Sequence, residues 1–144
     1  MDFIAYQQEG KVIKGERDIQ KAKSLLNMSE NMLKTIERIE ITDITASTVL
    51  SISYEALREV IEALCLMEGY KVYSHEAFTA YLIALKEESI AASFDRFRKL
   101  RNGINYYGKT VSLPTSEQAR KEIQQLCATL KEKYFGNKVG SNIR

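Results

Sequence analysis

The chain has 144 residues, 44% of them hydrophobic and 28% charged, which suits one domain with a substantial core. Its 21 Lys and Arg nearly balance its 19 Asp and Glu, so the net charge of +2 gives no global argument for binding to nucleic acid or to a membrane. Asp2 and Glu9 flank the first apolar residues, so no signal peptide is expected, and no apolar run approaches the roughly 20 residues of a membrane span. We therefore expect one cytoplasmic domain over residues 1–144, with flexible ends at 1–14 and 136–144.

The two cysteines, Cys65 and Cys127, each lie in an apolar helical pattern, with no Cys or His nearby at metal-ligand spacing. We expect both to be reduced core residues. The sequence also lacks a glycine-rich phosphate loop and an internal repeat. We therefore expect no metal and no cofactor.

Hydrophobic periodicity predicts a mostly helical chain, since most segments repeat at 3.6 residues and there is only one proline. The first helix is expected to run from near Glu16 to near Arg38. The β-branched segment 39–45 follows, and we interpret it as an interhelical connection because a lone strand would have no partner. A second helix is expected from Ala46 to Glu68, where Gly69 ends it.

The rest of the chain continues this pattern. Residues 70–73 are expected to form a short loop, after which Ser74 caps a third helix. The fourth helix contains residues 94–109. After Pro114, the spacing of residues 115–118 is that of a capping box and predicts a fifth helix. The expected fold class is all-α, an up-and-down antiparallel bundle of about five helices. Its predicted core comprises Leu26, Leu33, Leu57, Val60, Ile61, Leu64, Leu82, Phe94, Phe97, Ile104, Ile123, Leu126 and Leu130.

The fourth helix carries an unusual arginine on its apolar stripe. Arg101 falls in line with the stripe residues Ile90, Phe94, Phe97 and Ile104. An unpaired buried guanidinium costs several kcal/mol, so its position needs an explanation. Two explanations remain open: the side chain can snorkel to water, or it can face an anion. Glu55, Glu59 or Glu62 on the second helix could also be its partner.

The same region is locally basic. Between residues 94 and 109 the sequence has Arg96, Arg98, Lys99, Arg101 and Lys109 against one acid, Asp95. Such a patch could face phosphate or an acidic partner. For Lys99 the ordinary explanation is an ion pair with Asp95 on a solvated face. We expect His75, the only histidine, to be a polar helix-start residue rather than a catalyst.

Two segments resemble HEPN domains. The run from Tyr54 to Ala77, with its glycine, short loop and Ser-His helix start, is similar to the second-helix segment of that family. The later run Arg101-Asn102-Gly103-Ile104-Asn105-Tyr106 falls where the family carries an arginine, a polar residue, a short spacer and a histidine.

The resemblance implies an all-helical homodimer whose motif arginines meet across the two-fold axis in one cleft. Family members include metal-independent ribonucleases, often toxins neutralised by an MNT-type nucleotidyltransferase, and non-catalytic binding domains. By position, Arg101 would stabilise charge on the scissile phosphate and Asn102 would orient it. Tyr106 would occupy the histidine's place, where a phenol is a poor general base at neutral pH.

The hypothesis from the sequence is therefore a HEPN-like dimer whose cleft binds RNA or a nucleotide phosphate. The residues expected to bind the phosphate or RNA are Arg98, Arg101, Asn105 and Lys109. Metal-independent ribonuclease activity of the toxin-antitoxin type is included, with Arg101, Asn102 and Tyr106 as its catalytic residues. The alternative is a non-catalytic module that interacts with protein or binds nucleotide, and that partners a nucleotidyltransferase.

Overall fold

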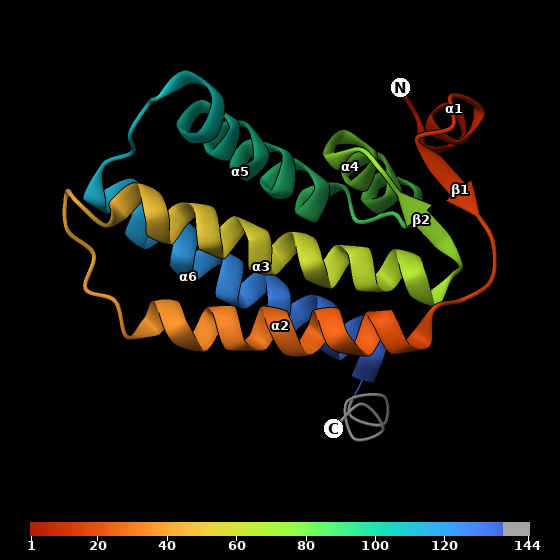
Figure 1. Ribbon diagram of the computed structural model, residues 1–144, viewed down its shortest axis with the longest axis horizontal. Coiled ribbons are helices and arrows are strands. Elements are labelled where there is room, and N and C mark those ends of the chain that lie inside the picture. The colour runs from red at the N-terminus through yellow and green to blue at the C-terminus, as the bar shows by residue number, and fades with distance from the viewer. Residues whose placement is uncertain (137–144) are drawn as a thin grey trace.

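A computed structural model describes residues 1–136 of the chain, and the prediction of a flexible tail falls outside these residues except at Gly136. The predicted all-α class is confirmed, with six α-helices, a π-helical turn and one small sheet in the described part (Figure 1). In chain order the elements are α1 (Phe3–Gln8), β1 (Val12–Lys14), α2 (Ile19–Glu37), α3 (Ala46–Met67), β2 (Tyr70–Val72), α4 (His75–Ala84), α5 (Glu88–Tyr107), α6 (Leu113–Leu130) and η1 (Lys131–Phe135).

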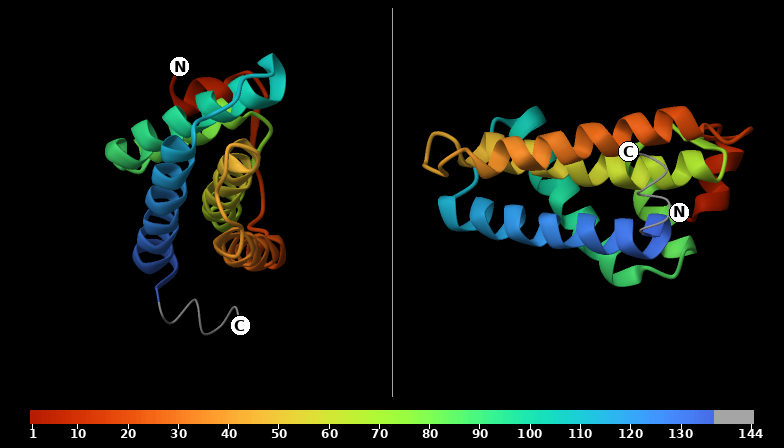
Figure 2. Two further views of the ribbon diagram at one scale, coloured as in Figure 1. Left: turned by 90° about the vertical axis from the view of Figure 1, so that its left-hand side faces the viewer. Right: turned by 90° about the horizontal axis from the view of Figure 1, so that it is seen from below.

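The helix α3 is the centre of the fold. It packs against α2 on one side, α6 on another and α5 on a third, and fourteen of its 22 residues are buried. The four long helices alternate in direction, so α2 and α3 form an antiparallel hairpin and α5 and α6 run back and forth beside it (Figure 1). Figure 2 shows α2, α3 and α6 side by side when seen from below. The shorter α4 packs on α5.

Most helix boundaries follow the predicted ones, and the caps explain the differences. Asp18 is the N-cap of α2 and accepts a hydrogen bond from the Lys21 amide, so this helix begins three residues after the predicted start at Glu16. The prediction of a cap at residue 115 is wrong. The cap of α6 is Ser112, and Pro114 lies inside the first turn, where its missing N–H costs nothing.

The N-terminal segment differs most from the prediction. Residues 1–14 were expected to be flexible, but they contain α1 and β1, and Phe3, Tyr6 and Val12 are buried. The segment predicted as a loop after Gly69 is β2, which pairs antiparallel with β1 so that residue 12 faces residue 72. The small sheet therefore ties the start of the chain to the connection between α3 and α4.

Gly69 sits where α3 ends and the sheet begins. Its φ is +88°, and a Cβ on this residue would collide with the backbone oxygen of Gly15. The amide of Gly15 donates to the Gly69 carbonyl at 2.7 Å, so the two backbones lie in direct contact. The position accepts glycine alone for two reasons, the left-handed backbone and the lack of space.

The predicted core is confirmed in its main part. Ten of the thirteen residues are buried, and the remaining three, Leu33, Ile104 and Leu126, are partly buried and pack against the core. Both cysteines are buried and free. Within residues 1–136, no helix is both long and apolar enough to cross a membrane.

Candidate functional site

Arg101 meets side chains from two other helices. Its Nη2 atom lies 2.6 Å from His75 Nδ1, at the start of α4, and its guanidinium lies 4.8 Å from the centre of the Tyr54 ring on α3. The Tyr54 hydroxyl is 2.8 Å from the same His75 nitrogen. The three residues form one contact group, which we call the Arg101 cluster.

The apolar stripe of α5 positions this cluster. Phe94 lies two helical turns before Arg101 on α5 and is fully buried. Its ring stacks on that of Tyr54 with ring centres 5.3 Å apart, and this contact holds the tyrosine in place. His75 is the first residue of α4, directly after the N-cap Ser74, and β2 brings this helix start to α5. A partly buried arginine on the stripe is therefore accommodated by an aromatic face and an imidazole.

The contacts determine the form of His75. A guanidinium only donates hydrogen bonds, so Nδ1 must accept and the proton of the neutral ring lies on Nε2. Burial lowers the pKa of His75 to about 4, and the positive charges of Arg58 and Arg101 act in the same direction. The imidazole is therefore neutral at physiological pH.

A second group of charges lies further along α3. Arg58 forms ion pairs with Glu55 and Glu62, and its Nη2 atom lies 4.0 Å from Glu59. Glu59 is only 3% exposed and one of its oxygens has no hydrogen-bond partner among the described residues. Burial raises its pKa to about 7, although Arg58 opposes the shift.

The partner of Arg101 is therefore not one of the three glutamates. They gather around Arg58, and within residues 1–136 no carboxylate oxygen lies within 4 Å of the Arg101 guanidinium. Its Nε atom is buried and also lacks a hydrogen-bond partner in this part of the chain. Arg101 thus keeps both an uncompensated positive charge and an unused donor.

A pocket of about 290 Å³ opens beside the Arg101 cluster. Its lining consists of Ser74, His75, Glu76, Arg98, Arg101, Asn102 and Tyr106. Arg98 carries part of the positive charge but is paired with Asp95 at 2.9 Å, and it lies 3.8 Å from Glu76. The Glu76 side chain is 63% exposed, so it can swing away from an incoming anion.

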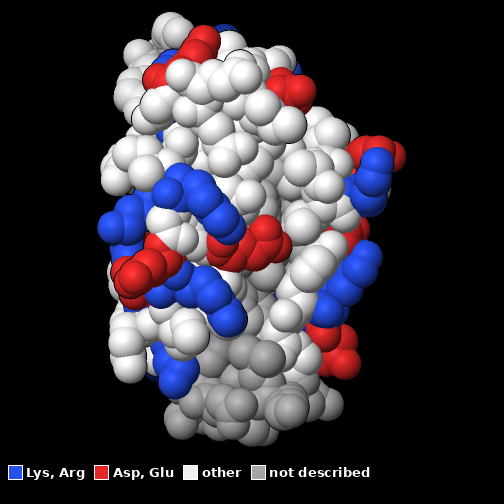
Figure 3. All heavy atoms as spheres, turned by 90° about the vertical axis from the view of Figure 1, so that its right-hand side faces the viewer, with Lys and Arg blue, Asp and Glu red and all other residues white. Residues whose placement is uncertain are grey.

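The end of the molecule that carries the small sheet has no broad patch of one charge. The end of the molecule that carries α1 and the sheet shows basic and acidic side chains intermixed, with a largely uncharged upper part (Figure 3). That face offers no large region of one sign. On this face, therefore, the charge pattern gives no broad electrostatic attraction for an anion.

Of the residues selected from the sequence, the structure brings Arg98, Arg101, Asn102 and Tyr106 to this pocket. Asn105 is exposed and does not line it, and Lys109 lies beside a different groove. Asn105 was selected because it follows Arg101 by one helical turn, and Lys109 because it belongs to the basic stretch 94–109. The helix ends at Gly108, whose left-handed φ of 64° turns the chain away before Lys109.

Two residues of the site were missed by the sequence analysis. His75 is at the start of its helix as expected, but its ring is partly buried against Arg101 rather than merely polar and solvated. Tyr54 falls within the segment that resembles HEPN domains, yet nothing in its spacing indicates a contact with α5. The sequence signal available for His75 was that it is the chain's only histidine and follows a cap.

The shifted pKa values of His75 and Glu59 make the stability of the fold depend on pH in opposite directions. The His75 pKa is lower in the folded chain than its ordinary 6.5, so the unfolded chain binds this proton first and stability falls as the pH drops from about 6.5 to about 4. The Glu59 pKa is raised from 4.5, so this carboxyl adds stability as the pH drops from about 7 to 4.5. The two contributions offset each other over an overlapping range.

Comparison of the chain with protein-family models, with curated proteins and with solved structures finds no match. The resemblance to HEPN domains therefore stays a prediction. Among residues 1–136, no group of three or more His, Cys, Asp or Glu side chains is placed to hold a metal ion.

Proposed function

We propose that this chain is a cytoplasmic, HEPN-like homodimer whose Arg101 pocket binds the phosphate of RNA or of a nucleotide. The observation that carries the proposal is the state of Arg101 within residues 1–136: partly buried, without a carboxylate, and with a buried Nε donor unused. A phosphate supplies both the counter-charge and the acceptor oxygens that a planar guanidinium fits.

The neighbouring groups favour an anion over a neutral ligand. Arg98 adds a second guanidinium, Asn102 adds an amide and Tyr106 adds a hydroxyl on the same wall. The Tyr106 ring is 70% exposed, so it is also free to stack on a base. The Glu76 carboxylate repels an anion, but its exposed side chain can rotate away from the pocket.

Binding is favoured over cleavage as the function of this site. A ribonuclease needs a base whose pKa lies near the working pH, and the His75 pKa of about 4 is too low for this. Its Nδ1 lone pair is also occupied by the Arg101 hydrogen bond. The non-catalytic alternative, a nucleotide-binding module that partners a nucleotidyltransferase, requires the same phosphate contact and no base.

The experiment that tests binding uses His75 as its reporter, because it is the only histidine and its NMR resonances are unambiguous. In the free protein we expect the ring to titrate near pH 4. A saturating single-stranded RNA oligonucleotide should raise this pKa, because phosphate cancels the positive field of Arg101 at the ring. Absence of RNA binding, or binding that leaves the His75 titration unchanged, would contradict the proposal.

Cleavage is the second candidate and has its own test. We expect little or no cleavage of RNA in EDTA by the natural sequence, and cleavage above that level by Tyr106→His, which restores the family's usual side chain near Arg101. The same samples report the oligomeric state by light scattering. A monomer at high micromolar concentration would contradict the composite dimeric cleft, and equal inactivity of both proteins would leave binding as the function.

A further inference from the structure

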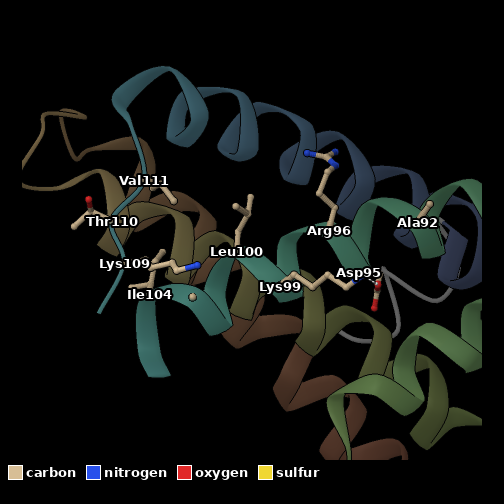
Figure 4. A pocket seen from close by; sticks show the side chains of 10 residues that line it. Ala92, Asp95, Arg96, Lys99, Leu100, Ile104, Lys109, Thr110 and Val111 are labelled. Carbon is tan, nitrogen blue, oxygen red and sulfur yellow. Dashed lines mark ion pairs between the residues drawn. The ribbon is translucent and has the colours of Figure 1, made fainter. Parts of the chain in front are cut away.

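A second and larger hollow of about 580 Å³ runs along α5, on the side where Lys109 lies. Its walls are one face of α5 between Ala92 and Ile104 and the segment 109–111, which closes one end. We call it the α5 groove. Figure 4 shows Leu100 and Val111 projecting into the space above α5, with the Lys109 amine reaching toward Leu100.

The floor of the α5 groove is apolar and firmly held. Leu100, Ile104 and Val111 are partly buried, so each packs on the core and still presents surface to the groove. The closing segment is anchored at both ends of its turn: the Lys109 amide donates to the Gly103 carbonyl at 3.0 Å, and the Val111 amide donates to Ser47 Oγ at 3.1 Å. The groove is therefore built by fixed elements.

The cations that line the α5 groove differ in whether they have an ion-pair partner. Arg96 pairs with Glu122 at 2.7 Å, and Lys99 lies 3.1 Å from Asp95, a carboxylate that it shares with Arg98, so both cations at the rim have an ion-pair partner. Lys109 has no ion-pair partner among residues 1–136. Its Cδ atom lies 3.5 Å from where a Gly103 Cβ would be, so the lysine stem crosses the helix over this glycine.

Size and shape select the occupant. The volume lies within the ~300–1,000 Å³ typical of small-molecule sites. The groove extends along α5 from residue 92 to residue 104, about 18 Å at 1.5 Å per residue, and an extended chain of ten carbons fits within that length. A single uncompensated cation at the closed end suits one negative charge, whereas a polyphosphate would need several.

We propose that the α5 groove binds a small amphipathic monocarboxylate, with its apolar chain on Leu100, Ile104 and Val111 and its carboxylate on Lys109. The Lys109 amine donates a charge-assisted hydrogen bond to the carboxylate. Burial of the chain on the apolar floor supplies the main driving force. This site is separate from the Arg101 pocket and does not depend on its function.

The test uses decanoate as the probe, measured by titration calorimetry below its micelle concentration. We expect saturable binding with one site per chain. Lys109→Met keeps an apolar stem without the charge and should weaken binding about tenfold. Gly103→Leu places a side chain in the groove while favouring the helix, and should abolish binding. Circular dichroism establishes that both variants are folded.

Two controls separate this site from general affinity for detergents. Lys121→Met removes an equal charge from the exposed face of α6 and should leave decanoate binding unchanged. Decyltrimethylammonium has the same chain with the opposite charge and should bind at least tenfold more weakly than decanoate. Equal effects of Lys109→Met and Lys121→Met, no binding of decanoate, or loss of self-association in Gly103→Leu, which would identify the groove as a subunit interface, would each overturn the proposal.

Discussion

Replacing Arg101 by lysine is expected to weaken the binding of single-stranded RNA roughly 10- to 100-fold, although the charge is kept. The reason lies in geometry. The guanidinium presents a planar set of donors that can face phosphate oxygens while one of them holds His75 Nδ1 at 2.6 Å. A lysine ammonium carries all its N–H donors on one nitrogen, so it cannot make both contacts in the same directions.

The measurement is fluorescence anisotropy with a labelled RNA oligonucleotide at fixed ionic strength, because binding to phosphate varies steeply with salt. Arg38→Lys is the matched control, since Arg38 is exposed at the end of α2, and it should bind like the natural sequence. A change in unfolding free energy for Arg101→Lys without any change in RNA affinity would show that the arginine is structural. The binding proposal would then fail.

The largest effect on stability is expected for Gly69→Ala, a loss of roughly 3–5 kcal/mol in the free energy of unfolding. Part of the cost comes from placing alanine at a φ of +88°. The rest comes from the new methyl group, which would meet the Gly15 carbonyl oxygen. The neighbour is backbone and cannot rotate away, so the contact between α3 and the sheet must open.

Gly10→Ala separates these two contributions. Gly10 also has a positive φ, +75°, but an added Cβ would meet nothing within 4 Å. It should therefore lose only about 1–2 kcal/mol, the backbone part alone. Urea unfolding of both variants measures the difference. Equal losses for the two alanines would mean that the close approach of Gly69 and Gly15 does not limit stability.

The bundle was predictable from sequence because its helices are long and amphipathic, so periodicity defines both their extent and their buried face. The same reasoning found Arg101, since a charge on an apolar stripe is visible without any structure. It failed for β1 and β2, because three-residue strands show no measurable alternation and their pairing joins distant positions.

The Arg101 cluster was only partly predictable for a related reason. The contacts of His75 and Tyr54 with Arg101 depend on how α3, α4 and α5 cross, and a single helical pattern does not contain that information. Lys109 was selected for its charge in the basic stretch 94–109, and the left-handed Gly108 changes the chain direction so that Lys109 lines a different groove from Arg101. Sequence periodicity therefore predicts the faces of helices and misses contacts made at their ends.

The small sheet also has a consequence for the order in which the protein folds and opens. The paired residues Val12 and Val72 are 60 positions apart, whereas the α2–α3 hairpin closes through a short connection. Because closing a long loop costs entropy that local contacts avoid, we expect the strand pair to form late in folding and to be among the first parts to open. His75 follows β2 by only three residues. Transient fraying of the N-terminal segment would therefore loosen the connection that leads into His75 while the helical bundle stays intact, which links the site to the least local contacts of the fold.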